Sequence, residues 1–195
     1  MGSGQDVDEW KVEMIYGERI RFRAVEKTDI PKFYEWINDP EVTEGLLINL
    51  PRSFADEESW FENVAKGEQA ERPMAIDIKE NDGWRLIGNC GLFHIEWINS
   101  IAEFGIMIGD KSVWNKSYGT ETVKLILQHG FETLNLNSIF LRVHSTNLRA
   151  IKAYEKAGFV LDGTMRQAVY KHGNYVDVHF MSVLRSEWNA RREKR

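Results

Sequence analysis

The chain has 195 residues, 43% of them hydrophobic and 12% aromatic, and a formal net charge of -5. These values exclude a disordered chain, and the acidic balance argues against binding to nucleic acid or to an anionic membrane. The single cysteine, Cys90, cannot form an internal disulfide, and we recognise neither a secretory leader nor a membrane-spanning run, so we expect a cytoplasmic protein. We expect one domain over residues 18–188, after an N-terminal extension over 1–17 whose first four residues are typical of a cloning remnant, and before a charged tail over 189–195.

Hydrophobic spacing predicts the elements of the N-terminal half. Residues 19–25 alternate as a half-buried strand, and a helix follows that has Pro31 in its first turn and ends at Asp39-Pro40. An irregular loop then leads to a short helix over residues 56–64, with Ser53 as its cap. Strands over 74–80, 84–95 and 101–108, joined by turns such as Asn81-Asp82-Gly83, predict an antiparallel meander.

The C-terminal half alternates between helices and strands. A helical period begins at Gly119, a strand covers 138–143, a helix over 148–157 ends at Gly158, and a last strand covers 175–184. A strand, helix, strand run implies a parallel strand pair. The expected fold class is therefore α/β, of the α+β kind, with a mixed, mostly antiparallel sheet flanked by helices.

The stretch from Trp114 to Thr120 (WNKSYGT) joins a strand to the helix that follows. Unpaired N–H groups and the positive end of the helix dipole converge there, which suits a phosphate group. Gly119 allows close approach of a ligand, Lys116 adds a positive charge, and Thr120 can bond either a phosphate or the helix itself. An ordinary capped helix start is the alternative, and the missing Gly-Lys-Ser/Thr ending excludes a P-loop.

A second segment, VHSTNLRAIKAYEKAGF (residues 143–159), places Asn147, Ala150 and Tyr154 on a helix closed by Gly-Phe. It resembles the second conserved block of the GCN5-related N-acetyltransferase family, and WNKSYG resembles the first block, Arg/Gln-x-x-Gly-x-Gly/Ala. Trp114 stands where that block has Arg or Gln, and Ser117 stands where it has its middle glycine. The ending YVDVHFMSVLRSEW is similar to those of the ribosomal-protein alanine and polyamine acetyltransferase branches.

The resemblance implies acetyl-CoA as the cofactor, bound where the parallel strands of Ile106 and Phe140 splay apart. It implies Tyr154 as general acid, with a core tyrosine as the alternative, and backbone N–H groups of Met107, ranked first, and Ile108 as donors to the thioester carbonyl. It implies Glu103 as the group that orients a water for the amine proton, with a solvent-facing carboxylate as the alternative. The expected cofactor-binding residues are Met107, Ile108, Trp114, Asn115, Lys116, Ser117, Tyr118, Gly119, Thr120, Asn147, Arg149, Ala150, Lys152, Tyr154 and Lys156, although a lysine on a helix surface is often only solvated.

The acceptor is expected to be a primary amine, with a protein N-terminus favoured over a polyamine. An α-amino group has a pKa of ~7.7 to 8.0, whereas an alkylammonium at ~10.4 costs about 4 to 5 kcal/mol to deprotonate near pH 7. An acidic set flanks the irregular loop and either attracts a basic acceptor or only caps helices: Glu41, Glu44, Asp56, Glu57 and Glu58. The competing class is a non-catalytic acyl-CoA-binding module. The five histidines show no metal spacing, and a homodimer is compatible with the resemblance.

Overall fold

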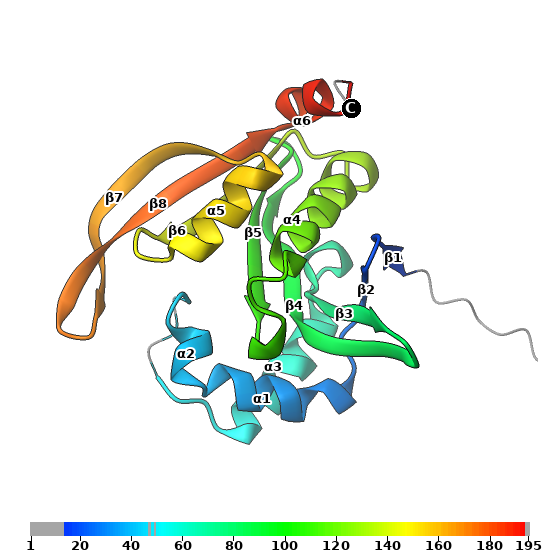
Figure 1. The fold of residues 1–195 in the computed structure, drawn as a ribbon, viewed down its shortest axis with the longest axis vertical. Coiled ribbons are helices and arrows are strands. Elements are labelled where there is room, and N and C mark those ends of the chain that lie inside the picture. The colour runs from blue at the N-terminus through cyan, green and yellow to red at the C-terminus, as the bar shows by residue number, and fades with distance from the viewer. Residues whose placement is uncertain (1–13, 47, 49, 194–195) are drawn as a thin grey trace, which may run out of the picture.

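The chain folds around one twisted sheet, as a computed structural model shows for residues 14–46, 48 and 50–193 (Figure 1). Most of the N-terminal extension expected over residues 1–17 lies outside this described part. The strands of the described part are β1 (Ile15–Tyr16), β2 (Ile20–Ala24), β3 (Met74–Glu80), β4 (Gly83–Glu96), β5 (Ile101–Ile108), β6 (Ser138–His144), β7 (Val160–Lys171) and β8 (Asn174–Leu184). The helices there are α1 (Ile30–Ile37), α2 (Pro40–Thr43), α3 (Phe54–Lys66), α4 (Tyr118–Gln128), α5 (Leu148–Ala157) and α6 (Arg185–Arg192), together with short 3-10 and π turns.

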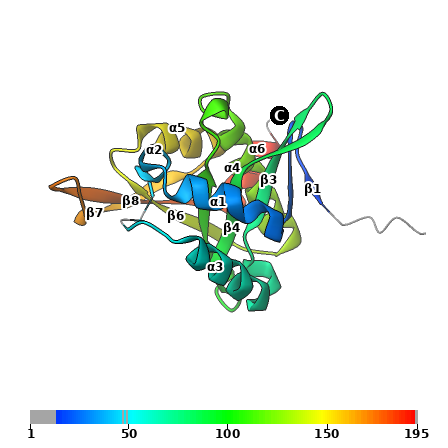
Figure 2. The same ribbon diagram turned by 90° about the horizontal axis from the view of Figure 1, so that it is seen from below.

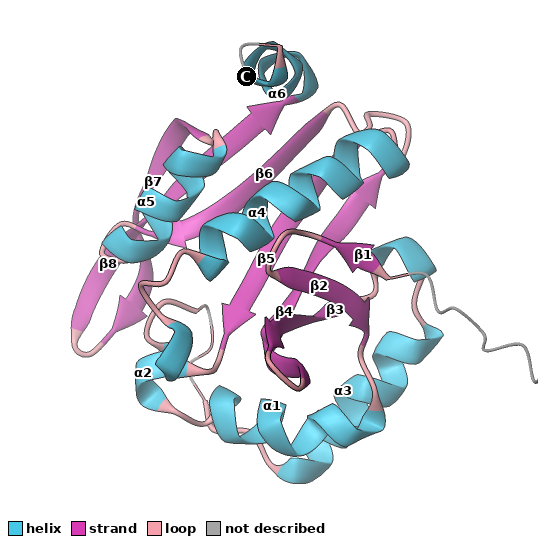
Figure 3. Ribbon diagram, turned by 45° about the vertical axis from the view of Figure 1, so that its right-hand side comes forward, coloured by secondary structure: helices cyan, strands magenta, loops and turns pink. Residues whose placement is uncertain are grey.

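The strand order is β1-β2-β3-β4-β5-β6-β8-β7, and every neighbouring pair is antiparallel except β5 and β6. The predicted fold class is therefore confirmed, including the meander β3-β4-β5 and the single parallel pair. Helices α4 and α5 lie side by side over β5 and β6 (Figure 3), whereas α3 lies below the sheet when α5 is above it (Figure 2).

Two hydrophobic clusters fill the two faces of the sheet. The larger one joins α4 and α5 to the strands and includes Phe104, Ile126 and Tyr154. The smaller one joins α1 to β5 through Phe33, Trp36 and Met107. Since side chains alternate along β5, successive residues of this strand face different clusters. Strand β5 is thus the wall between the two sides of the molecule.

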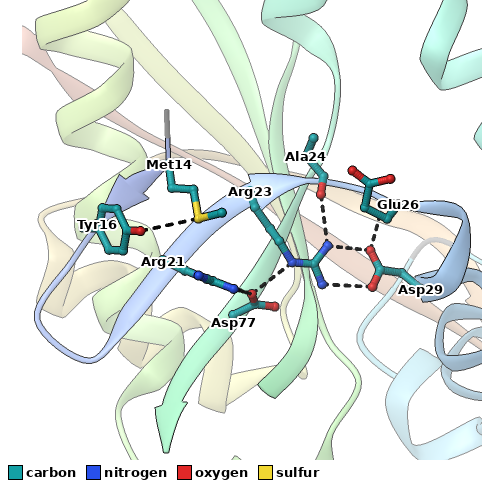
Figure 4. Close-up of polar contacts among 8 residues, drawn as sticks. All are labelled: Met14, Tyr16, Arg21, Arg23, Ala24, Glu26, Asp29 and Asp77. Carbon is teal, nitrogen blue, oxygen red and sulfur yellow. Dashed lines mark hydrogen bonds and ion pairs between the residues drawn. The ribbon is translucent and has the colours of Figure 1, made fainter. Parts of the chain in front are cut away.

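An ion-pair network anchors α1 to the sheet (Figure 4). The Arg23 guanidinium on β2 donates to both carboxylate oxygens of Asp29, at 2.7 and 2.9 Å, and to Oδ2 of Asp77 on β3, at 3.0 Å. Arg21 also pairs with Asp77, at 2.9 Å. Asp29 directly precedes α1, and both aspartates are buried. The network therefore fixes the position of the N-terminus of α1 relative to β2 and β3.

Several elements differ from the prediction. The helix expected over 56–64 begins at Phe54 and runs to Lys66, because Ser53 and Asp56 form a capping box at its start. Strand β7 was not predicted at all, since most of its residues are exposed and carry no alternating pattern. Helix α6 runs through the predicted start of the charged tail at 189. No helix in the described ranges is long and apolar enough to cross a membrane.

Candidate functional site

The parallel strands β5 and β6 separate partway along their length. Their pairing ends at Glu103 opposite Phe140, but β5 continues to Ile108 and β6 to His144. The free stretches leave an opening between two neighbouring strands of one sheet. Backbone N–H groups that face this opening have no strand partner there, so they are available to a ligand.

Hydrogen bonds at the end of β5 show which peptide groups face the opening. The Gly109 N–H donates to the Ile87 carbonyl on β4, at 2.9 Å, so odd-numbered residues of β5 direct their peptide groups toward β4. The N–H groups of Ile106 and Ile108 therefore face the opening. The N–H of Met107 faces β4, which corrects the ranking of Met107 as the first backbone donor. Its side chain belongs instead to the α1 cluster on the opposite face.

Trp114 and Arg149 form a stacked pair at the end of the opening. The Trp114 indole N–H donates to the Ile108 carbonyl, at 2.9 Å, which fixes the ring against β5. The Arg149 guanidinium carbon lies 3.7 Å from the centroid of that ring. Arg149 on α5 thus places a positive charge beside Trp114, the residue that stands where the first family block has Arg or Gln.

The start of α4 has the geometry of an anion site. Asn115 and Ser117 both adopt left-handed backbone, with φ of 62° and 68°. Ser117 is the N-cap of α4, yet its hydroxyl makes no cap hydrogen bond, so the first N–H groups of the helix are not satisfied by this side chain. A Cβ at Gly119 would lie 3.5 Å from Ile108, which places the helix start against the end of the opening. The ordinary capped helix is therefore not what the structure shows.

The other residues predicted to bind the cofactor divide into three groups. Thr120 and Ala150 are partly buried near the starts of α4 and α5, and Lys152 and Lys156 are exposed on α5. Lys116 and Tyr118 line a polar hollow beside the β3–β4 hairpin. The Asn147 side chain caps α5 by accepting from the Ala150 N–H, at 3.2 Å. Asn147 therefore has its predicted capping role, whereas Met107 of the predicted set lies on the opposite face of β5.

Tyr154 is buried on α5 against the β5 wall. Its ring packs edge-on against Phe104, at 6.3 Å between centroids, and in a tilted arrangement against Phe159, at 5.8 Å. Burial raises the pKa of Tyr154 to about 12, so the phenol keeps its proton throughout the neutral range. The residue packs as a core tyrosine does, and it also remains a proton donor.

The Glu103 carboxylate is paired and mostly buried, unlike the solvent-facing carboxylate that was the alternative to a catalytic role. Its oxygens accept from the Arg142 guanidinium, at 2.7 and 3.2 Å, and Oε2 lies 3.2 Å from Nδ1 of His94. Its side chain is only 14% exposed, and alternation directs it away from Phe104 and Tyr154. Glu103 therefore lies at the mouth of the opening, on the face of β5 that carries Met107.

A cavity of about 550 Å³ occupies that second face. It extends from α1 and α3 to β4 and β5, and its apolar lining includes Phe33, Trp60 and Met107. Its charged lining has four carboxylates and two guanidinium groups, those of Arg52, Asp56, Glu57, Glu68, Glu71 and Arg72. A hollow with this composition suits a cationic ligand that has apolar segments.

The predicted acidic set does not form one cluster. Most members have partners: Glu41 binds Lys111 at 3.0 Å, Glu44 binds His172 at 2.8 Å, Glu58 approaches Lys27 at 3.8 Å, and Asp56 belongs to the α3 capping box. Glu57 is the buried member, and it lines the cavity. Only Asp56 and Glu57 of the five lie in the cavity lining, which sequence spacing alone could not show.

The described residues include no group of three or more His, Cys, Asp or Glu side chains placed to hold a metal ion. Cys90 is buried in β4, and burial raises the pKa of its thiol far above the usual value. Its thiolate is therefore scarce at neutral pH, as expected of a structural cysteine.

Comparison with known proteins identifies the family. The family model for the acetyltransferase (GNAT) domain matches residues 19–160. The chain is 30% identical to the N-acetyltransferase p20 of Bacillus licheniformis, over 91% of this chain and 99% of that protein. It is 29% identical to the spermidine N(1)-acetyltransferase of Vibrio cholerae, over 90% and 98%. A crystal structure of spermidine N-acetyltransferase from Vibrio cholerae in complex with CoA and spermine superposes with a TM-score of 0.81, at 26% identity, over 89% of this chain and 99% of that one.

The fold and the site thus define an acetyltransferase of the GNAT type. The chain belongs to the GCN5-related N-acetyltransferase family and uses acetyl-CoA as its acetyl donor. The residues at the opening fit this donor: strand-like peptide groups suit its amide-containing arm, and the uncapped helix start with nearby Arg149 suits its phosphates.

Proposed function

We propose that this enzyme acetylates a primary amine of a polyamine-like acceptor. The observation that carries this proposal is the cavity on the Met107 face of β5, with four carboxylates against two guanidinium groups. The spermidine acetyltransferases among its relatives support the same choice. This reverses the order expected from the sequence, where a protein N-terminal amine stood first.

The reversal depends on how the amine loses its proton. An alkylammonium costs about 4 to 5 kcal/mol to deprotonate near pH 7, so its use requires a path that carries this proton to solvent. The carboxylates of the cavity would bind the ammonium form, and Glu103 with its neighbour His94 lies at the mouth of the opening, where the proton can leave. We assign Glu103 the role of orienting the water that carries this proton toward solvent.

The remaining roles follow from geometry. Acetyl-CoA supplies the acetyl thioester. The N–H of Ile108, assisted by that of Ile106, would polarise the thioester carbonyl, since both face the opening. The amine nitrogen forms the new C–N bond as the C–S bond breaks, and the Tyr154 hydroxyl gives its proton to the departing sulfur. With its pKa at about 12, Tyr154 is a weak acid, so proton transfer must accompany C–S cleavage.

A direct assay tests the acceptor. The purified enzyme is given acetyl-CoA with either spermidine or a peptide bearing a free N-terminal alanine, and CoA release is followed at pH 7.5. We expect saturable turnover with a kcat/KM at least tenfold higher for spermidine. A higher kcat/KM for the peptide would favour a protein N-terminal amine as the acceptor. Binding of acetyl-CoA without transfer to either amine would favour the non-catalytic acyl-CoA-binding module.

We also propose a homodimer and a cytoplasmic location, both first expected from the sequence. Strand β7 is the last strand of the sheet order, and several of its apolar side chains are exposed, among them Leu161, Met165 and Tyr170. An apolar edge strand favours association with a second copy. Sedimentation equilibrium with the wild type should give twice the monomer mass; a monomer at micromolar concentration would exclude this interface.

A further inference from the structure

Glu57 differs from the other charged residues around the cavity. It is 9% exposed and lines the cavity, and although its backbone N–H donates to the Ser53 carbonyl, its carboxylate makes no hydrogen bond or ion pair with any residue that the structure describes. Its neighbours are engaged: Asp56 binds Ser53, Glu68 accepts from the Trp97 indole at 3.0 Å, and Glu71 accepts from the Ile95 N–H at 2.5 Å. The charged groups that line the cavity with Glu57 are Arg52, Asp56, Glu68, Glu71 and Arg72.

The position of Glu57 is fixed by its helix. The capping box formed by Ser53 and Asp56 sets the first turn of α3. One turn further along, Trp60 packs edge-on against Phe33, at 5.8 Å between ring centroids, in the cluster that includes Met107. Residues three apart share a helix face, so Glu57 is directed to the same side as Trp60, toward β5. The carboxylate is therefore held on a rigid element beside the strand that faces the acetyl donor.

A largely buried carboxylate without a cationic partner lowers the stability of the ligand-free enzyme. Burial raises the pKa of the Glu57 carboxyl above its usual value, the nearby Arg52 lowers it, and Asp56 raises it again. Arg52 forms no ion pair with Glu57 within the described part of the chain. A bound cation would supply the missing partner and offset the cost of burying the charge.

We propose that Glu57 is the residue that binds an ammonium group of the acceptor amine. The inference rests on the proposed function, because it names the group that recognises the substrate of that same site. Glu57 then contributes to acceptor affinity and has no contact with acetyl-CoA, which lies on the other side of the β5 wall.

The test compares Glu57→Gln with Glu58→Gln. Both variants lose one carboxylate from the same turn of α3, but the Glu58 side chain is 44% exposed and lies 3.8 Å from Lys27 in a surface pair. Spermidine is the acceptor probe, and KM is measured for it and for acetyl-CoA. We expect Glu57→Gln to raise the spermidine KM at least tenfold while the acetyl-CoA KM changes less than twofold, and Glu58→Gln to change both less than twofold.

A second measurement separates recognition from folding. The pKa of Glu57 is raised in the folded state, so ionisation of this residue lowers stability once the pH exceeds its unfolded value of ~4.3. The melting temperature of Glu57→Gln at pH 7 should therefore be at least equal to that of the wild type, and the two should converge near pH 4. A variant that loses spermidine affinity without losing stability supports a binding role.

The outcomes for the inference and for the proposed function are distinct. Equal spermidine KM in the wild type and Glu57→Gln would overturn the role of Glu57 while acetyl transfer itself stands. If the wild type transfers no acetyl group, the proposed function fails, and calorimetric titration of spermidine then decides on Glu57 independently. Binding weakened at least tenfold in Glu57→Gln supports the inference, and equal binding or no binding by the wild type overturns it.

Discussion

On the α4–α5 side of β5, two short continuous segments supply nearly every group that would hold acetyl-CoA, whereas on the α3 side the proposed acceptor cavity is assembled from residues spread between Phe33 and Met107. Among the described residues, neither the Arg149 guanidinium on the first side nor the Glu57 carboxylate on the second forms an ion pair. Under the proposed function, the two substrates would therefore meet opposite charges on the two sides of β5. Changes on one side should affect one substrate more than the other.

The largest effect is expected from the network that anchors the acceptor side. Arg23→Ala would leave Asp29 buried without its bidentate partner, and loss of one member of a buried pair costs about 3 kcal/mol or more. Urea unfolding measures this loss. Since Asp29 precedes α1, the spermidine KM should rise more than the acetyl-CoA KM.

The control for Arg23 is Lys32→Ala, which removes an exposed pair with Glu35 at 2.9 Å and should cost less than about 0.5 kcal/mol. If Arg23→Ala raises the spermidine KM and the acetyl-CoA KM equally, the ion-pair network affects both sides of β5 and not the acceptor side alone.

The next effect concerns chemistry on the donor side. Tyr154→Phe keeps the packing against Phe104 and Phe159 but removes the proton donor, so kcat should fall about 10- to 100-fold. Calorimetric titration should find acetyl-CoA affinity within a few-fold of the wild type. Tyr16→Phe, at an exposed position on β1, is the matched control and should keep its kcat. Unchanged turnover in Tyr154→Phe would remove this residue from the mechanism.

Much of the fold could be predicted, because its signals are local in sequence, and the residues predicted for the donor side come from equally local segments. Strands β3 and β5 and helix α5 have the predicted bounds, and the two family blocks each lie within one turn and one helix. Strand β7 lacked such a signal because an edge strand that is exposed on both faces has no alternation to detect. The ranking of Met107 as the first backbone N–H donor is wrong for a related reason. Whether Met107 or Ile108 faces the opening depends on the register with β4, and a shift of one residue exchanges the two.

The acceptor side resisted prediction because its charges find partners far away in the chain. Glu41 and Lys111 are 70 residues apart, and Glu44 and His172 are 128 apart. In the sequence the five acidic residues near the loop are equivalent, and only tertiary contacts show that Glu57 differs from them. The stacking of Arg149 on Trp114 is likewise a contact between segments, so the role of Trp114 could not be derived from the first block alone.

A smaller effect on the donor side should follow from Arg149→Ala. The stacked guanidinium is held beside the start of α4, where a charge-assisted bond to a phosphate is worth about 1.5 kcal/mol, so acetyl-CoA affinity should fall about tenfold. Lys152→Ala removes a similar charge from the same helix without a stacking partner and should cost about twofold. Equal losses in a calorimetric titration would indicate a general charge effect in place of a positioned contact.

The smallest effect is expected at Ser117, whose φ of 68° is costly for a residue with a Cβ. Ser117→Gly should stabilise the protein by about 1 kcal/mol, less the added flexibility of glycine in the unfolded chain. Ser112→Gly is the control, because Ser112 lies in a 3-10 turn without positive φ and should lose a few tenths of a kcal/mol. If Ser117→Gly also tightens acetyl-CoA binding, the serine is a strained element of the phosphate site. If stability rises and affinity does not, the left-handed turn is already formed in the wild type, and donor affinity is set by Arg149 and the helix start.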